Sequence, residues 1–555
     1  MRAIRCRAVV RRALTSVGAT VVLVVLVALT TGRAGATTPP YGTSSNDALA
    51  GCPAGTAQCP SSDPFYQPPA NLASLRDGTL IGMRPATVAE AGLQSAKAAY
   101  TISFRSEDAF GAPVLDTATV LLPSAPYAGL GSQPLVSVQF AEDSLGAQCQ
   151  PSYALAHPNT NGNVDAESSN AGALLAQGYV VVAPDFDGPA EQFIVGQQEG
   201  HAVLDGLRAA RSLPAAGLTR STPVAMTGYS GGAHATGWAA EFAAGYAPDL
   251  NVVGAAEGGT PADLAATGRS LNGSLFFGLS LLSSQGLDRG FPATGIYAAL
   301  NARGRSVYAQ TSTDCVGQAA TAFPGQSFDD YTTTPDVTDT PPLRALLLHE
   351  QLGQTAPQFP ILNYHVVNDE IVPFAQDVSL VKYYCQKSTP VQFAALGGDH
   401  ISGEAAATPL VEAFLRARFS GITPANDCAA VAALPGSASS VPDSSGGGAG
   451  TGTAARPPSH AVIRLAVRPS RLTARRLVQM RFRATARVSG HLRPVAAARI
   501  TVAGRVARTN RRGDATITTT FRRPGRYRAR AHRAGFIDGT AMVYVRRPLA
   551  ARFTG

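Results

Sequence analysis

Short apolar runs alternate with helical patterns along the first four hundred residues of the chain. Strands are predicted where residues are continuously apolar or alternate with polar ones, at 99–105, 117–122, 134–140, 179–183, 252–256, 360–366 and 391–396. Helices are predicted at 169–177, 201–213, 233–244 and 405–419, with a further helix ending at 384. Because strands and helices that alternate in this way form a sheet covered on both faces, the pattern predicts an α/β fold with a mainly parallel sheet.

This rhythm is interrupted between residues 258 and 358, where the pattern becomes helical and irregular. We interpret the interruption as an inserted helical cap over the site. An apolar block at residues 275–282 fits such a cap, although the same eight residues taken alone would suit a core helix equally well.

One apolar run, beginning near residue 223, leads directly into the motif Gly-x-Ser-x-Gly centred on Ser230. In a nucleophile elbow the serine takes a strained conformation at the tip of a strand-to-helix turn, and Gly228 and Gly232 let strand and helix approach closely. The motif alone also occurs in ordinary turns. Its place between a buried strand and a predicted helix favours Ser230 as a nucleophile.

A serine hydroxyl becomes an effective nucleophile when a base accepts its proton, and a third group must orient that base. In α/β-hydrolases these groups follow in the order serine, acid, histidine, each in a loop after a strand. Asp369 follows the strand at 360–366, and His400 follows the strand at 391–396. Ser230, Asp369 and His400 are therefore the predicted catalytic residues.

Other acids and histidines are alternatives to this assignment. Glu370 and Asp377 are further acids after the same strand, and Asp377 falls on the next predicted helix. His349 precedes the acid in the chain, so the order of the three groups disfavours it. His365 lies inside a predicted strand. A surface histidine is the alternative interpretation of His400.

The transition state of ester cleavage carries negative charge on the former carbonyl oxygen, which two preplaced N–H donors stabilise. One donor is predicted to be the backbone N–H of Gly231, directly after the nucleophile. The second is predicted to be the backbone N–H of Asp143, in the loop after the strand at 134–140. An acidic side chain is an unusual neighbour for an oxyanion, so a turn cap is the alternative role of Asp143.

The first 36 residues have the pattern of a secretory signal peptide. Five arginines precede an apolar run at 17–29, and Ala34-Gly35-Ala36 then matches a small-x-small cleavage site. The run is short for a membrane span, which disfavours an uncleaved anchor helix. The mature chain is expected to begin near Thr37, to be extracellular and to have no transmembrane anchor.

The cysteine content agrees with export. Cys6 lies in the signal, and the six other cysteines allow three disulfides, of which Cys52–Cys59 is favoured by proximity. The remaining pairings stay open. No cysteine lies at metal-ligand spacing with another cysteine or a histidine, so no zinc site is expected, and the predicted chemistry requires no cofactor.

A change in composition separates a second domain. Residues 431–458 are rich in Ser, Gly, Ala and Pro and are predicted to be a flexible linker after a catalytic domain of residues 37–430. In residues 459–555 apolar and polar positions alternate over short runs, for example at 478–484. This pattern predicts a small all-β domain, an antiparallel sandwich of the immunoglobulin type.

The two domains carry opposite charge. Residues 37–450 contain 16 Lys and Arg against 35 Asp and Glu, whereas residues 451–555 contain 24 arginines against two aspartates. No recognisable nucleic-acid motif accompanies this charge, so nucleic acid is not the expected partner. An anionic cell envelope or polysaccharide is favoured, which implies cell-wall association. Docking on the acidic catalytic domain is a further alternative.

Several motifs together resemble the fungal and bacterial secretory lipases. The matching segments are Asp63-Pro64-Phe65-Tyr66, Glu142-Asp143-Ser144, Ala183-Pro184-Asp185, Gly228-Tyr229-Ser230-Gly231-Gly232, Gly259-Thr260-Pro261-Ala262-Asp263-Leu264 and Asp369-Glu370-Ile371-Val372-Pro373. The likeness covers Asp63 to Cys428 and implies an α/β-hydrolase with a helical cap that cleaves carboxylic esters of lipids. It also implies the same triad and oxyanion residues. The basic C-terminal domain departs from the fungal pattern, which leaves the place of action open.

The sequence therefore predicts a secreted serine ester hydrolase of the triacylglycerol lipase type that acts through an acyl-enzyme. A short-chain or cutinase-like carboxylesterase is the alternative among enzymes. A cell-surface binding or adhesion protein built on a hydrolase scaffold is the alternative from another class. A broken triad would favour the binding protein, and all three triad residues are present in the sequence.

Overall fold

The computed structural model describes residues 49–434 and, with short gaps, residues 461–546. The gaps are residues 470, 475–476, 489–490, 497, 504, 534–535 and 538. The predicted signal peptide and most of the predicted linker lie outside the described residues. The chain divides into two compact units, Met1–Pro442 and Asp443–Gly555. Within the described residues, no helix has the length and apolar character needed to cross a membrane.

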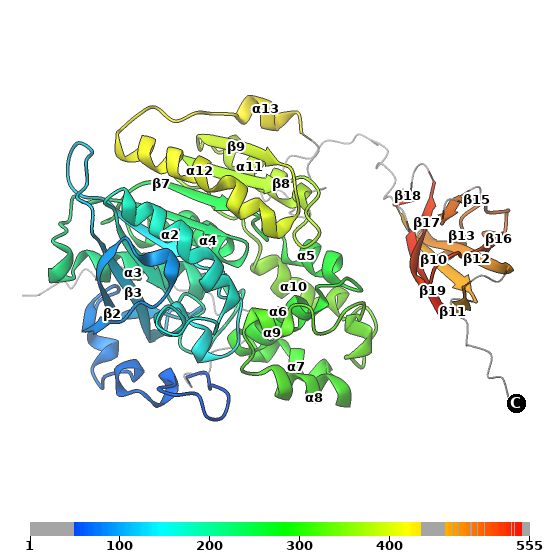
Figure 1. The fold of residues 1–555 in the computed structure, drawn as a ribbon, viewed down its shortest axis with the longest axis horizontal. Helices are drawn as coiled ribbons and strands as arrows, with labels where there is room; N and C mark the ends of the chain where they lie inside the picture. The colour runs from blue at the N-terminus through cyan, green and yellow to red at the C-terminus, as the bar shows by residue number, and fades with distance from the viewer. Residues whose placement is uncertain are drawn as a thin grey trace, which may run out of the picture. The chain divides into compact units, whose positions relative to one another are not determined.

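A sheet of nine strands forms the centre of the first unit, as described for residues 49–434 (Figure 1). The strands are β1 (Leu80–Ala86), β2 (Ala96–Glu107), β3 (Pro113–Pro123), β4 (Leu135–Gln139), β5 (Val180–Pro184), β6 (Pro223–Tyr229), β7 (Asn251–Gly258), β8 (Ile361–Val366) and β9 (Val391–Leu396). Their order in the sheet is β1-β2-β3-β5-β4-β6-β7-β8-β9. Neighbours from β5 to β9 are parallel, whereas β1, β2 and β3 pair antiparallel. The mainly parallel sheet is confirmed, and β1 is a strand that the sequence analysis missed.

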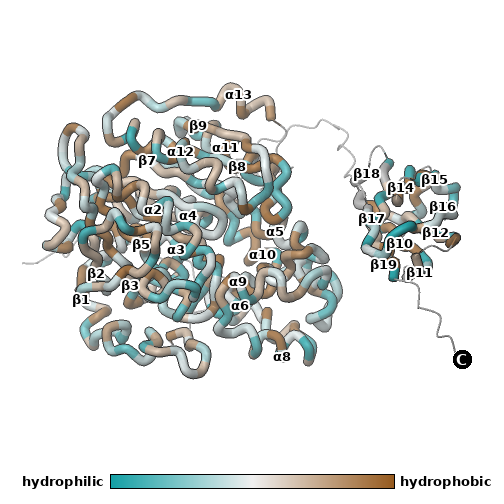
Figure 2. Tube along the Cα trace, in the orientation of Figure 1, coloured by the Kyte–Doolittle hydropathy of each residue, from teal (hydrophilic) through white to brown (hydrophobic). Residues whose placement is uncertain are grey.

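The central strands are buried on both faces because helices cover the sheet from both sides. Every residue of β5 is buried, and its valines colour it as hydrophobic in Figure 2. α3 (Gly196–Arg211), α4 (Gly231–Tyr246) and α11 (Phe374–Gln386) contribute to the core on one face. α2 (Gly162–Ala176) and α12 (His400–Phe419) contribute to the core on the other.

Polar caps explain why α2 and α12 begin earlier than predicted. The side chain of Asn161 accepts a hydrogen bond from the backbone N–H of Asn163, which fixes the start of α2. Asp399 and Ser402 form a reciprocal capping box that starts α12 at His400. Such caps satisfy N–H groups that have no partner inside the helix, so they set the first turn without any apolar periodicity.

The cap predicted between residues 258 and 358 is a group of helices inserted between β7 and β8, coloured green in Figure 1. These helices are α5 (Leu264–Leu271), α6 (Phe277–Gly290), α7 (Ile296–Ala299), α8 (Ala302–Thr311), α9 (Val316–Ala319) and α10 (Pro341–His349). They share a core of their own that includes Leu282, Phe291 and Leu346. Most of the apolar block at 275–282 lies in α6 and therefore belongs to the cap.

Short helices complete the first unit. The two remaining α-helices are α1 (Pro151–Ala154) and α13 (Cys428–Ala432). The 3-10 helices are η1 (Pro60–Ser62), η2 (Pro64–Tyr66), η3 (Leu72–Ser74), η4 (Ala91–Leu93), η5 (Ala147–Cys149), η6 (Pro214–Ala216), η7 (Pro292–Thr294), η8 (Phe328–Asp330) and η9 (Val337–Asp339).

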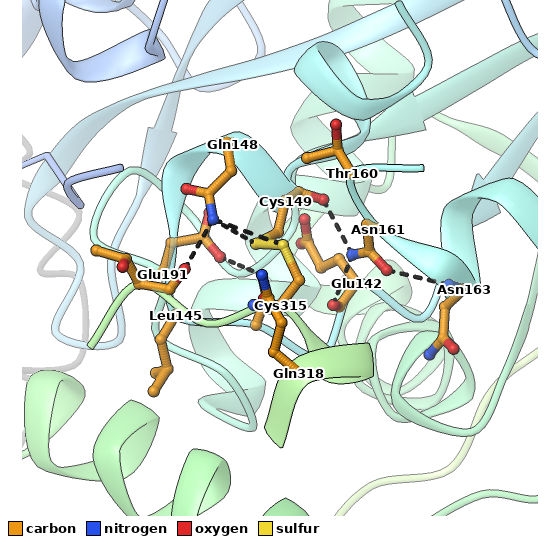
Figure 3. The surroundings of a disulfide bond; sticks show 12 residues. Glu142, Leu145, Gln148, Cys149, Thr160, Asn161, Asn163, Glu191, Cys315 and Gln318 are labelled. Atoms are coloured by element: carbon orange, nitrogen blue, oxygen red, sulfur yellow. Dashed lines mark hydrogen bonds between the residues drawn. A yellow bond between two sulfur atoms is a disulfide. The ribbon is translucent and has the colours of Figure 1, made fainter. Parts of the chain in front are cut away.

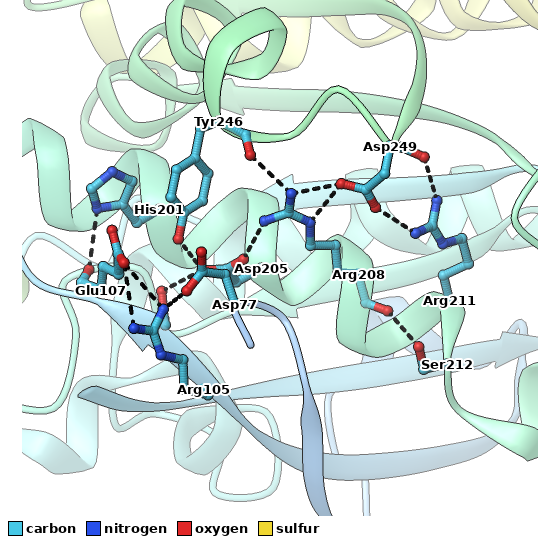
Figure 4. Close-up of polar contacts among 11 residues, drawn as sticks. Asp77, Arg105, Glu107, His201, Asp205, Arg208, Arg211, Ser212, Tyr246 and Asp249 are labelled. Carbon is cyan, nitrogen blue, oxygen red and sulfur yellow. Dashed lines mark hydrogen bonds and ion pairs between the residues drawn. The ribbon is translucent and has the colours of Figure 1, made fainter. Parts of the chain in front are cut away.

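A polar network fastens α3 to the end of α4 (Figure 4). Arg208 pairs with Asp205 at 2.9 Å and with Asp249 at 2.6 Å, and Arg211 pairs with Asp249 at 2.7 Å. The hydroxyl of Tyr246 donates to the buried carboxylate of Asp205 at 2.7 Å. Because the network includes a buried acid with several donors, it holds the two helices that support the elbow in a fixed relation.

Three disulfides join the six cysteines of the described first unit: Cys52–Cys59, Cys149–Cys315 and Cys385–Cys428. The pairing of Cys52 with Cys59 is confirmed. Cys149 lies in the loop region after β4, whereas Cys315 lies in the cap, so their bridge ties the cap to that loop (Figure 3).

The second unit contains two sheets. One holds β10 (Ala461–Arg468), β12 (Leu477–Val488), β13 (His491–Pro494), β16 (Asp514–Thr520) and β18 (Phe536–Ile537), and the other holds β11 (Arg471–Thr473), β14 (Arg499–Val502), β15 (Arg505–Arg508), β17 (Gly525–His532) and β19 (Gly539–Arg546). Residues of both sheets form one core, so the β-sandwich is confirmed. The β10–β18 and β11–β19 pairs are parallel, which corrects the expectation of a wholly antiparallel sandwich.

We predict that removing the Cys149–Cys315 bridge destabilises the first unit more than removing Cys52–Cys59. The bridges span 166 and 7 residues, and the longer loop gains more entropy when it opens in the unfolded chain. Replacing each pair by alanine should cost about 5 and about 2 kcal/mol respectively. Trp238 is the single tryptophan and is buried in α4, so urea unfolding followed by its fluorescence reports this unit. Equal costs would contradict the prediction.

Candidate active site

Ser230 lies at the tip of a sharp turn between β6 and α4. Its backbone has φ 54° and ψ −119°, a strained conformation for a residue with a side chain. A Cβ atom on Gly228 would lie 2.3 Å from the carbonyl oxygen of Gly232, and one on Gly232 would lie 2.0 Å from that of Gln139. Gly228 is therefore required for β6 and α4 to approach each other, as in a nucleophile elbow, and Gly232 is required for α4 to approach the end of β4.

The structure brings Ser230, His400 and Asp369 together. Nε2 of His400 lies 2.8 Å from the hydroxyl of Ser230, and Nδ1 lies 2.6 Å from Oδ2 of Asp369. The side chain of His400 is 4% exposed and that of Asp369 is fully buried. Both contacts are within hydrogen-bond distance, which is the geometry of a nucleophile, a base and an orienting acid.

His400 is the first residue of α12, not part of a loop as the sequence analysis expected. Asp399 caps the N-terminus of α12, and two further side chains hold the backbone of His400. The hydroxyl of Tyr229 donates to the His400 carbonyl at 2.7 Å, and the His400 N–H donates to the carboxylate of Glu370 at 3.2 Å. The imidazole is therefore fixed by the helix start and by residues next to both of its partners.

Asp369 is held as an ionised carboxylate. Its Oδ1 accepts hydrogen bonds from the backbone N–H groups of Ile371 at 2.9 Å and Val372 at 2.7 Å. Burial by itself raises the pKa of this carboxyl, but hydrogen bonds and charge from His365 and His400 outweigh burial and hold the pKa well below its usual range. The alternative acid Glu370 is exposed and contacts the His400 backbone instead of its ring.

His365 and Asp377 are two buried groups whose relation to this site the sequence analysis missed. The sequence pattern assigns His365 to a strand and gives Asp377 only as an alternative acid. In the structure Nε2 of His365 lies 3.3 Å from Oδ2 of Asp369, and Nδ1 lies 2.6 Å from Oδ2 of Asp377. A histidine inside a mostly apolar strand, with acids four and twelve residues later, was the available signal.

Asp143 and Gly231, the predicted oxyanion residues, lie next to each other beside Ser230. All three line the same cavity, and a Cβ atom on Gly231 would lie 1.9 Å from Oδ1 of Asp143. The backbone of Asp143 has a positive φ of 43°. Burial, and then the charge of Glu199, raise the pKa of the Asp143 carboxyl to about 7. This carboxyl therefore changes charge near neutral pH.

The loop that carries Asp143 is anchored on both sides. The amide of Asn161 donates to the Glu142 carbonyl at 2.9 Å, and the hydroxyl of Ser144 donates to Glu191 at 2.6 Å. From the cap, the guanidinium of Arg289 donates to the carbonyl of Leu145 at 2.8 Å. Figure 3 shows Glu142 and Glu191 beside the Cys149–Cys315 bridge. The loop is thus held in place by groups from the sheet side and from the cap.

A cavity extends from Ser230 into the cap. It encloses about 1120 Å³ of space not filled by atoms, part of it open to solvent. Apolar side chains from the cap and from the loop after β8 make up most of its lining, among them Leu264, Leu271, Leu287, Ile296, Leu300 and Val372. An apolar cavity next to the Ser230 hydroxyl suits an extended hydrophobic group.

One group of carboxyls in the described residues has the spacing of metal ligands. Glu142, Asp187 and Glu191 are buried and bring one oxygen each within 4.8 Å of one another. Oxygen donors of this kind suit Ca²⁺ or Mg²⁺. Burial raises the pKa of Glu142 and Asp187 well above the usual range and that of Glu191 to about 8. Neutral carboxyls account for the cluster equally well.

The fold and this arrangement together define an α/β-hydrolase with a helical cap. The profile of the secretory lipase family matches residues 157–427. Lipase A of Moesziomyces aphidis is 33% identical over 386 residues, which cover 66% of this chain and 82% of that protein. The chain belongs to the secretory lipase family.

Two further comparisons bear on what membership in this family implies. The crystal structure of Candida antarctica lipase A matches with a TM-score of 0.63 and 32% identity, over 67% of this chain and 89% of that chain. A Mycobacterium tuberculosis protein named "Probable inactive lipase MT1628" is 33% identical over 370 residues, which cover 65% of this chain and 83% of that protein. Because a relative bears that name, the chemistry of this chain has to be argued from its own residues.

We predict that activity declines at alkaline pH because Asp143 becomes charged. A carboxyl with a pKa of about 7 is neutral below that pH, and above it a carboxylate would repel the oxyanion. From about pH 6 to about pH 9 the kcat/KM of the native protein should fall about tenfold or more. Asp143→Asn keeps the backbone N–H and should hold kcat/KM level over this range. A parallel decline in the variant would contradict the assignment.

Proposed function

We propose that the protein is a secreted lipase that cleaves carboxylic esters of lipids through a serine acyl-enzyme. The observation that carries the proposal is the 2.8 Å contact between the Ser230 hydroxyl and the base His400, at the edge of an apolar cavity. Membership in the secretory lipase family supports both lipid esters as substrates and an extracellular place of action.

In the proposed mechanism, the hydroxyl oxygen of Ser230 attacks the ester carbonyl carbon while Nε2 of His400 takes its proton. Asp369 keeps Nδ1–H of His400 in place and stabilises the imidazolium. The negative oxygen of the tetrahedral intermediate faces the backbone N–H groups of Gly231 and Asp143. His400 then returns the proton to the departing alcohol. Water, activated by the same base, releases the fatty acid from Ser230.

The cavity favours long acyl chains over short ones. Each methylene group that leaves water for an apolar lining contributes about 0.8 kcal/mol. A cavity lined by leucines, isoleucine and valine offers this gain to many methylene groups of one chain. A lipase of the triacylglycerol type therefore fits this cavity better than a short-chain or cutinase-like esterase, whose small acyl group would leave most of the cavity empty.

The second unit supports a further part of the proposal, contact with an anionic cell envelope or polysaccharide. Arginines alternate with core residues along its strands, for example Arg481 and Arg483 on β12 and Arg526 and Arg528 on β17, and these side chains are exposed. A surface with this density of positive charge attracts polyanions in a salt-dependent way.

Replacing Ser230 by alanine should abolish hydrolysis of p-nitrophenyl esters, because no serine oxygen is then available to form the acyl-enzyme. The loss of kcat should be at least ~10³-fold. Ser212→Ala is the matched control, since that exposed hydroxyl only donates to the Arg208 carbonyl at 2.9 Å. The unfolding midpoint of both variants should equal that of the native protein. Substantial turnover by the Ser230 variant would refute the serine mechanism.

Filling the cavity should change the preferred acyl length. Ala265 lines the cavity on α5, and Ala265→Trp places a bulky ring where methylene groups would lie. Losing contact with three or four of these groups corresponds to about 2–3 kcal/mol, or a ~10²-fold loss of kcat/KM for long-chain esters. Butyrate esters should be affected little. Ala302→Trp, at an exposed position on α8, is the control. An unchanged chain-length profile would show that the acyl group binds elsewhere.

A further inference from the structure

Behind the triad lies a second buried pair made of a histidine and a carboxylate. His365 on β8 and Asp377 on α11 both have fully buried side chains. Nδ1 of His365 lies 2.6 Å from Oδ2 of Asp377, and its Nε2 lies 3.0 Å from the carbonyl of Val372 and 3.3 Å from Oδ2 of Asp369. The oxygen Oδ2 of Asp369 thus faces both His365 and the base His400.

The contacts determine how many protons this pair holds. The carbonyl of Val372 can only accept, so Nε2 of His365 must carry a proton. At 2.6 Å, the contact between Nδ1 and the Asp377 carboxyl also needs a proton between them. Burial disfavours a charged ring, but the carboxylates of Asp377 and Asp369 outweigh burial and raise the pKa of His365 to about 10. His365 is therefore a buried cation at neutral pH.

Further acids lie near the two carboxylates that contact this cation. Glu257 on β7 is fully buried, and burial followed by the charge of Asp377 raises its pKa well above the usual range. Glu370 follows Asp369 in the loop and accepts from the backbone N–H of His400, whose ring lies 5.1 Å from that of Tyr229. Within this group Asp369 must stay ionised for His400 to act as a base. A positive charge next to its Oδ2 favours the ionised form over proton sharing among neighbouring acids.

We propose that His365, fixed by Asp377, is a positioning residue that keeps Asp369 ionised and aimed at His400. The catalytic relay of this protein then consists of five side chains, Asp377, His365, Asp369, His400 and Ser230. This inference rests on the proposed function, because it assigns His365 and Asp377 a role in the same reaction. Neither residue is itself among those that line the cavity.

The variant Asp377→Asn tests the relay with the smallest change in shape. Without the carboxylate, His365 becomes neutral while its Nε2–H remains in place. The coupled pair of Asp369 and His400 should then bind its proton at higher pH. We expect the acid limb of the kcat/KM profile to move up by about half a pH unit or more, equivalent to about 0.7 kcal/mol. We expect kcat to fall about tenfold, less than the ~10²–10⁴-fold contribution of general acid–base catalysis, with KM unchanged.

The double variant His365→Gln with Asp377→Asn provides a second measurement, because it removes both charges together and leaves no unpaired carboxylate. It should show the same shifted acid limb. Glu241→Gln is the matched control. Its buried carboxylate also contacts α11, accepting from the hydroxyl of Tyr384 at 2.9 Å, and further accepts from the N–H of Gly353. This control should lower the unfolding midpoint and leave the acid limb and kcat unchanged.

The outcomes separate the relay from the proposed function. A shifted limb and lower kcat in both relay variants, with the control unshifted, support the inference. If the relay variants lose only stability, as the control does, the pair is purely structural and the inference is overturned while the triad stands. If Ser230→Ala remains active, the proposed function fails whatever the relay variants show.

Discussion

The close crossing of β6 and α4 at Ser230 is the constraint on which the rest of the site depends. Gly228 allows the crossing because a side chain there would overlap the carbonyl oxygen of Gly232, at 2.3 Å. Gly232 in turn lets α4 approach the end of β4, where a side chain would overlap the carbonyl oxygen of Gln139, at 2.0 Å. The resulting turn puts the serine in a strained conformation at the carboxyl end of a central strand. β8 and β9 lie on the same side of β6 in the sheet order and deliver the acid and the base to that edge.

The buried acids near this edge show two solutions to one electrostatic problem. A carboxylate taken out of water must be given donors or a cation, or it must stay protonated. Asp369 follows the first course, with two backbone N–H groups and two imidazoles. Burial pushes Glu142, Asp187 and Glu257 towards the second, since it is the first cause of the raised pKa of each. The contrast marks Asp369 as an acid that the fold keeps charged.

Much of this architecture could be predicted from the sequence, and the parts that could not have a common physical reason. The parallel sheet and the elbow follow from apolar runs and from a glycine pattern that few other turns require. The positions of Ser230, Asp369 and His400 follow from strand ends. The start of α12 depends instead on the side chains of Asp399 and Ser402, and the place of His365 depends on a neighbour twelve residues away on another element. The spacing of apolar residues along the sequence gives no information about contacts of that kind.

The cap and the oxyanion loop are also coupled, by contacts that no sequence pattern shows. The Cys149–Cys315 bridge and the hydrogen bond from Arg289 to the Leu145 carbonyl both join the cap to the segment that follows Asp143. The same cap supplies most of the apolar lining of the cavity. A displacement of α6, which carries Arg289, would therefore act on the acyl cavity and on the oxyanion loop together. Since a covalent bond limits how far the two can separate, the fold favours small shifts of the cap over its complete release from the site.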